Sequence, residues 1–209
     1  MRSSAFSALV LTGYAAIAIA AEGADAPILR AEQVVRESFT GTTPEQWKTR
    51  LAQDHTQALC SRYHNAPPAD AAASIVADAR GSMRYPESGK LLGNWKEGER
   101  LAAISTGGHI GRLQPDPPDS EHGGNCYACH ALAATEIAAG TLGPSLTGYG
   151  KLHGQSPEAV KFVYEKIYNA QATFPCSLMP RFGRNAWLTP EQIADTVAFL
   201  LDPDSPVNK

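Results

Sequence analysis

Two thiols and an imidazole lie within five residues of one another, in the Cys-Tyr-Ala-Cys-His segment at 126–130. This spacing is the attachment signature of a c-type haem. On the first turn of a helix, Cys126 and Cys129 point to one side, where they can form thioethers to the two porphyrin vinyl groups. His130 then lies under the ring plane with a nitrogen directed at the iron. The segment therefore predicts one covalently bound haem c, with His130 as an axial ligand of the iron.

A Cys-x-x-Cys pair can also be a zinc half-site or a thioredoxin-like redox pair. A zinc site needs a second pair of ligands nearby, and a redox pair belongs to a βαβ setting. Neither context accompanies Cys126 and Cys129, so the haem is favoured. The alternative to a haem protein is a structural or metal-binding module without haem, which would be colourless.

The other two of the four cysteines, Cys60 and Cys176, lie outside this segment. Two leftover cysteines in an oxidising compartment most often pair. A Cys60–Cys176 bridge would stabilise the chain by on the order of 4–5 kcal/mol in the chain-entropy model, because it closes a long loop. The alternative is a reactive thiol near the haem, which pairing would remove.

The chain has 209 residues, enough for one domain with an appendage or for two small domains. It is 43% hydrophobic and 19% charged, which is ordinary for a globular protein, and its formal net charge is −3. No basic run stands out, which argues against nucleic acid as a partner.

Residues 1–20 have the pattern of a Sec-type signal peptide, with Arg2 before a largely apolar stretch and small residues at 18–20. A membrane anchor is the alternative, but the stretch is short for a span and no positively charged flank follows it. No other segment is apolar enough to cross a bilayer. We therefore expect a mature protein without a membrane span in a bacterial periplasm, where haem attachment and export occur together.

Apolar residues recur with helical spacing, and no alternating strand of convincing length is present, so the sequence predicts an all-α fold. Residues 21–91 form a helical N-terminal extension without a constellation that suggests chemistry, and residues 92–209 form the main domain. The role of the long loop at 107–125 is left open. The predicted helices cover residues 28–39, 43 to just before 67, 70–80, 94–104, 156–169 and 189–203.

A helix, a haem motif, a proline-containing loop, a helix, a methionine loop and a final helix follow one another from residue 92. Class I cytochromes c, which this part of the chain resembles, have the same order of elements. In that family the first and last helices cross closely, which Gly98 opposite Phe199 would allow. The family also uses a proline carbonyl to accept the N–H of the axial histidine, and Pro144 matches that residue. Such a bond fixes the imidazole ring and raises its basicity.

The same resemblance implies Met179 as the sixth ligand of the iron, in a proline-flanked loop between the last two helices. Most methionines only fill a core. Here, however, Met1 leaves with the signal peptide and Met83 precedes the haem motif. An iron held by His130 and Met179 has no open position, which implies an electron carrier rather than an oxygenase or a peroxidase.

Three histidines are rivals for the sixth position: His109, His122 and His153. His109 and His122 lie at either side of the long loop, so they can also bind a separate metal together. Solvated loop histidines without a ligand are the commoner case.

Five segments of the chain resemble SoxX, the monohaem subunit of the SoxAX cytochromes of bacterial sulfur oxidation. The likeness extends from Leu92 to the C-terminus, and short SoxX proteins lack the helices at 28–80. The segments are GNCYACH at 124–130, GPSL at 143–146, VYEKIYN at 163–169, MPRFG at 179–183 and LDPDSPVN at 201–208.

In that family, SoxAX couples thiosulfate oxidatively to a cysteine of the carrier SoxYZ, at a cysteine-ligated haem in SoxA. The resemblance implies that this chain forms a heterodimer with a SoxA-type subunit as the electron-accepting part of an L-cysteine S-thiosulfotransferase. It would pass electrons to a small cytochrome c and hold no catalytic residue of its own. The alternatives are a stand-alone periplasmic electron-transfer protein and the cytochrome subunit of another dehydrogenase.

Overall fold

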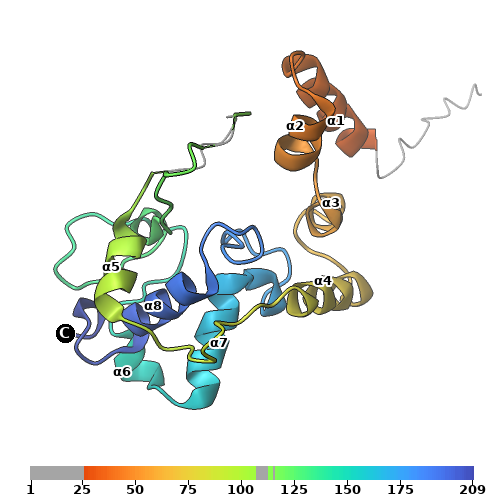
Figure 1. The fold of residues 1–209 in the computed structure, drawn as a ribbon. Coiled ribbons are helices and arrows are strands. Elements are labelled where there is room, and N and C mark those ends of the chain that lie inside the picture. The colour runs from red at the N-terminus through yellow and green to blue at the C-terminus, as the bar shows by residue number, and fades with distance from the viewer. Residues whose placement is uncertain (1–25, 107–112, 115) are drawn as a thin grey trace, which may run out of the picture. The chain divides into compact units, whose positions relative to one another are not determined.

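A computed structural model describes residues 26–106, 113–114 and 116–209, and every regular element within these ranges is helical (Figure 1). The predicted all-α fold is confirmed. The predicted signal peptide at 1–20 and His109 lie outside the described residues. The chain divides into two units, one ending at Ser38 and the other spanning Phe39–Lys209. The domain boundary expected at residue 92 stays a prediction.

The first unit contributes one described element, helix α1 (Ala26–Ser38), close to the predicted range of 28–39. Glu32 and Arg36, one helical turn apart, form an ion pair of 2.6 Å on its surface. Pairs at this spacing support a helix by a few tenths of a kcal/mol.

The second unit begins with three helices, and here one prediction is wrong. The helix expected from Thr43 to just before residue 67 is two helical pieces, α2 (Pro44–Gln46) with a π-helical turn to Leu51, and α3 (His55–Arg62). Asp54 separates them because it starts a helix of its own: its carboxylate accepts from the Gln57 N–H at 2.9 Å, and the Gln57 side chain accepts from the Asp54 N–H. This is a capping box. Helix α4 (Ala69–Gly81) follows, close to its predicted range.

Three of the remaining helices begin at a residue whose side chain caps them. Asn94, Ser156 and Thr189 each accept a hydrogen bond from the backbone of the first turn. The short helix α6 was not predicted, because its five residues are too few to show a helical period. The bounds are α5 Trp95–Ala103, α6 Tyr149–His153, α7 Pro157–Tyr168 and α8 Pro190–Leu201, with 3-10 turns at Cys126–Ala128, Ala170–Ala172 and Pro206–Asn208.

Helices α5 and α8 cross in close contact, as the glycine at 98 predicts (Figure 1). A Cβ on Gly98 would overlap the carbonyl oxygen of Asp195 and lie 2.8 Å from the Cβ of Phe199. Around this crossing lies the main core, which α7 completes with the fully buried ring of Tyr164. The core therefore joins the helices that precede and follow the Cys-x-x-Cys-His segment.

Candidate haem site

The segment at 126–130 forms a single 3-10 turn, Cys126–Ala128. Asn125, directly before it, has a left-handed backbone with φ of 43°, a conformation that asparagine tolerates better than most residues. The backbone N–H of His130 donates to the Cys126 carbonyl at 2.9 Å. Both cysteines and the histidine thus stay within one tight turn.

The sequence placed this segment on the first turn of a helix, but the chain leaves the turn after Cys129. The carbonyl of Tyr127 accepts from the Gly140 N–H at 2.9 Å, and that of Cys129 accepts from the Gly143 N–H at 2.8 Å. A continuing α-helix would use these carbonyls for residues four positions later. The following loop therefore folds back against the turn and brings residues 143 and 144 beside it.

His130 is oriented by this loop. Its Nδ1 lies 2.7 Å from the Pro144 carbonyl oxygen, which is the contact that the cytochrome c resemblance implies. A carbonyl only accepts, so Nδ1 carries the proton and Nε2 is the nitrogen available to a metal. Gly143 lies flat against the ring, because a Cβ there would come within 2.6 Å of Nδ1 and 2.8 Å of Nε2.

His130, Cys126 and Met179 all line one cavity in the second unit. Apart from these three side chains and Thr196, whose hydroxyl donates to the Gln192 carbonyl within α8 at 2.9 Å, its walls are apolar. The apolar walls include Leu132 and Leu146 of the loop, Ile167 of α7, Leu188, and Phe199 and Leu200 of α8.

This donor set fits a haem c. A porphyrin needs apolar walls, and its covalent attachment needs thiols at its edge. An imidazole and a thioether are the axial ligand pair of many cytochromes c. The residues present therefore match the group that the Cys-x-x-Cys-His segment predicts.

The two motif thiols are free and half-buried. Burial raises the pKa of the Cys126 thiol to about 12, and the nearby Cys129 adds to the rise.

The rival histidines within the described residues do not line this cavity. The ring of His122 stacks on Trp187 with centroids 4.0 Å apart, and its Nε2 lies 3.3 Å from Asp116 Oδ2. His153 belongs to α6, where it packs on Tyr149 at 4.2 Å. No group of three or more His, Cys, Asp or Glu side chains suited to a metal ion occurs in the part of the chain that the structure describes.

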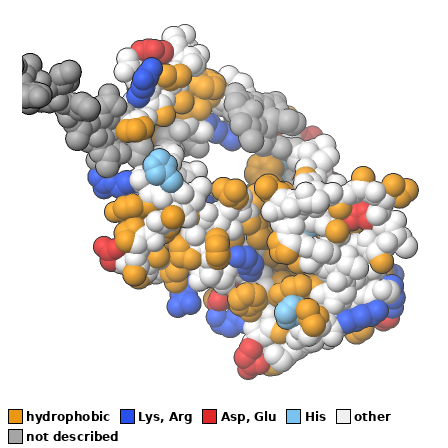
Figure 2. Space-filling view, turned by 180° about the vertical axis from the view of Figure 1, so that it is seen from behind, with side chains coloured by type: hydrophobic (Ala, Val, Ile, Leu, Met, Phe, Trp, Pro, Cys, Tyr) orange, Lys and Arg blue, Asp and Glu red, His pale blue; other side chains and the backbone are white. Residues whose placement is uncertain are grey.

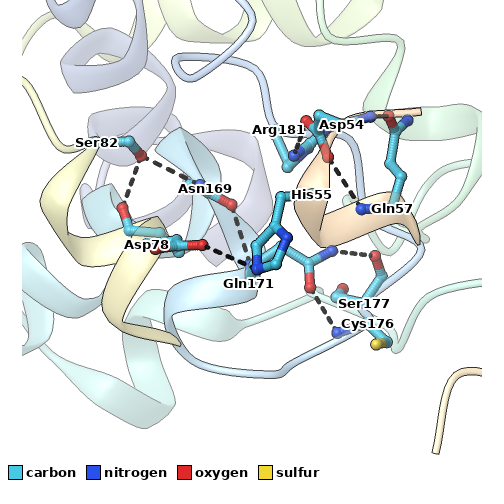
Figure 3. Close-up of polar contacts among 11 residues, drawn as sticks. Asp54, His55, Gln57, Asp78, Ser82, Asn169, Gln171, Cys176, Ser177 and Arg181 are labelled. Atoms are coloured by element: carbon cyan, nitrogen blue, oxygen red, sulfur yellow. Dashed lines mark hydrogen bonds and ion pairs between the residues drawn. The ribbon is translucent and has the colours of Figure 1, made fainter. Parts of the chain in front are cut away.

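Cys60 of α3 and Cys176 form a disulfide, with Cα atoms 5.4 Å apart. The bridge ties α3 to the Met179 loop, which we define as residues 173–183. Sequence reasoning missed two further contacts of this loop, the ion pair between Arg181 and Asp54 at 2.7 Å and the hydrogen bonds of Gln171 (Figure 3). Neither helical periodicity nor residue spacing predicts an ion pair between residues as far apart in sequence as Asp54 and Arg181.

No helix among the described residues combines the length and the apolar character needed to cross a membrane.

Comparison with known proteins shows what this chain is similar to. The family model for cytochrome c matches residues 122–202, which include His130 and Met179. A protein of Aquifex aeolicus (strain VF5) named "Uncharacterized lipoprotein" is 43% identical over 163 residues, covering 78% of this chain and 76% of the relative. The crystal structure of SoxXA from P. pantotrophus matches 53% of this chain and 82% of that chain with 26% identity and a TM-score of 0.37. A TM-score this low does not establish a shared architecture.

Proposed function

Because this chain is a c-type cytochrome with a covalent haem c and belongs to the family of the Aquifex aeolicus lipoprotein, we propose that it is the electron-accepting subunit of a SoxAX-type complex. The chain is an electron carrier. The observation that carries this function is the placement of His130 and Met179 on one apolar cavity. The SoxX-like segments at 124–130, 143–146, 163–169, 179–183 and 201–208 support the narrower assignment.

Each site residue has a distinct part in this proposal. Cys126 and Cys129 would hold the haem covalently, and His130 and Met179 would supply the imidazole and the thioether that bind its iron. The Pro144 carbonyl keeps the proton of His130 on Nδ1, so that Nε2 would be the nitrogen that binds the iron. The bound haem supplies a one-electron iron couple, and a thioether ligand favours its ferrous state and raises its potential. With both residues bound, the iron would have no open position for a substrate.

The reaction of the proposed complex is the oxidative coupling of thiosulfate to a cysteine of a SoxYZ-type carrier. The bond-forming chemistry belongs to the SoxA-type partner, and this chain takes up the released electrons and passes them to a small cytochrome c. Its compartment would be the bacterial periplasm, where haem is attached to exported apoproteins.

The charge distribution shows no basic patch on the face drawn in Figure 2. On the face drawn in Figure 2, lysine and arginine side chains are scattered among acidic and apolar ones, and the net charge of the chain is −3. A nucleic-acid-binding surface gathers basic residues into a patch or stripe.

Co-expression with a SoxA-type subunit, in cells that attach haem, tests the proposal. We expect the two chains to co-purify as a heterodimer and thiosulfate to reduce this chain's haem only when the partner and the SoxYZ-type carrier are present. A coloured chain that stays monomeric and adds nothing to thiosulfate-dependent turnover would instead be a stand-alone electron carrier or the subunit of another dehydrogenase. A colourless product would contradict the haem as well.

A further inference from the structure

Helix α3 contacts the Met179 loop at two points, one on each side of the methionine. Cys60, within α3, is joined by the disulfide to Cys176, three residues before Met179. Asp54, the N-cap of α3, pairs with Arg181, two residues after it. Because an extended chain spans at most about 3.5 Å per residue, the Cα atom of Met179 lies within about 10 Å of the Cα atoms of Cys176 and Arg181.

Both anchors are partly shielded from water. The disulfide sulfurs belong to residues that are 8% and 5% exposed, and the Arg181 side chain is 12% exposed. Ion pairs in such positions are screened less by salt than pairs on the open surface. The Asp54 carboxylate is also held in place beforehand, because it accepts the Gln57 N–H (Figure 3).

On its buried side, the Met179 loop is held by hydrogen bonds to Gln171, which is 6% exposed. Its side-chain amide donates to the Ser177 carbonyl at 2.9 Å, and its amide oxygen accepts from the Cys176 N–H at 2.5 Å. The backbone N–H of Gln171 in turn donates to Asn169, whose side chain reaches Ser82 at the end of α4 (Figure 3).

Apolar burial does little to hold the outer side of the loop. Leu178, next to Met179, is 74% exposed. A cleft of about 330 Å³ lies between α3 and the loop. Amide and hydroxyl side chains such as Gln57 and Ser61 make up much of its lining, and Met179 lines it as well. Cys60, Cys176 and Ile75 form a small cluster of their own, separate from the main core. The disulfide and the ion pair therefore restrain this side of the loop, in addition to the Gln171 hydrogen bonds and the packing of Phe182 in the main core.

We propose that α3 is a brace for the sixth ligand: the Cys60–Cys176 bridge and the Asp54–Arg181 pair hold Met179 at the haem. Cys60, Cys176, Asp54 and Arg181 are positioning residues, which act on the iron only through Met179. Without the brace, Met179 leaves the iron more often, and the sixth position accepts an added ligand more readily. This inference rests on the proposed role of Met179 as sixth ligand.

Two variants of the haem-loaded protein test the brace. Cys60→Ser with Cys176→Ser removes the covalent anchor. Asp54→Asn removes the charge of the second anchor but keeps a good N-cap, since asparagine caps helices as well as aspartate does, so it stays informative if the double variant folds poorly. Lys209→Gln is the matched control, because it removes an exposed ion pair to Asp204 in the same unit.

The readouts are imidazole titration of the ferric protein, the long-wavelength absorption band of ferric iron bound to a thioether, and amide hydrogen exchange in residues 176–183. An added ligand binds in proportion to the fraction of molecules with an open sixth position, so we expect the cysteine double variant to bind imidazole about tenfold more tightly. Asp54→Asn should show a smaller rise and the control none. Amide exchange in the loop should speed up in the same order.

Unchanged imidazole affinity and loop exchange in both variants, with the thioether band intact, would overturn the brace alone. A wild-type ferric spectrum without that band would remove Met179 as a ligand and the brace with it. Binding to a SoxA-type partner is measured separately, so its failure would bear on the proposed complex and not on the brace.

Discussion

The orientation and the tautomer of the His130 imidazole are fixed by two residues of the loop that follows it. The Pro144 carbonyl accepts its Nδ1 proton, and Gly143 leaves room for the ring to lie against the backbone. A histidine ligand with a fixed ring and tautomer presents the same nitrogen to the metal at all times, which favours tight and specific ligation.

Gly143→Ala should therefore disturb the histidine. The added Cβ meets the ring rather than a flexible side-chain end, and overpacking of this kind costs about 1–3 kcal/mol. Urea unfolding of the holoprotein measures the loss, and the reduction potential reports any shift of the ring. Gly41→Ala is the control, since nothing lies within 4 Å of a Cβ there. Equal stability of the two variants would contradict the close packing.

Met179→Ala should leave the haem attached but lower its reduction potential, because the thioether no longer stabilises the ferrous state. Spectroelectrochemical titration measures the change. Leu178→Ala, at the exposed neighbouring residue, should keep the wild-type potential. If Met179→Ala keeps it too, another residue is the sixth ligand.

At the scale of the helices, α5 and α8 form the frame on which the site is built. Their crossing buries Leu101 and Val197. Just before the 3-10 turn at Cys126–Ala128, the Gly124 N–H donates to the Leu101 carbonyl of α5 at 2.8 Å. The loop that contains Cys126 is thus attached directly to the end of α5.

Gly98→Ala tests the crossing. The new methyl group would overlap the backbone of α8 at Asp195, so we expect a loss of about 1–3 kcal/mol in the free energy of unfolding even though alanine is the better helix former. Gly81→Ala, on α4 with open space around it, should be neutral or slightly stabilising. Thermal unfolding of both holoproteins compares them, and a stabilised Gly98→Ala would contradict the contact.

At the scale of the second unit, the helices before residue 92 and the cytochrome-like region are joined covalently. The disulfide connects residues separated by 116 positions, so it closes a loop of more than half the chain. Its expected contribution to stability is about 2–5 kcal/mol, through the entropy of the unfolded chain.

Thiol titration of the unfolded, unreduced holoprotein tests the bridge. All four cysteines are then engaged, two in thioethers and two in the disulfide, so no free thiol should react. Reduction before titration should release the thiols of Cys60 and Cys176 and lower the midpoint of urea unfolding. Two free thiols without reduction would rule the bridge out.

Features that depend on neighbours within a few residues could be predicted from the sequence. The Cys-x-x-Cys-His spacing indicates the cofactor. The capping residues Thr43, Ser156 and Thr189 mark helix starts, because each accepts a hydrogen bond from the backbone three positions later. The start of α3 at Asp54 belongs to this class too, because its Asp-x-x-Gln capping box spans only four residues, although helical spacing predicts one longer helix across it.

The contacts that orient the two proposed axial ligands came only from the tertiary structure. Spacing does not reveal that Gly143 lies against His130, or that Asp54 pairs with Arg181 across most of the chain. The resemblance suggested Pro144 as the partner of His130, but the distance between them depends on how the loop folds back on the 3-10 turn at Cys126–Ala128. Such contacts depend on how separate segments pack in three dimensions. The sequence by itself therefore determined which cofactor the protein holds, and packing decided which residues surround His130 and Met179.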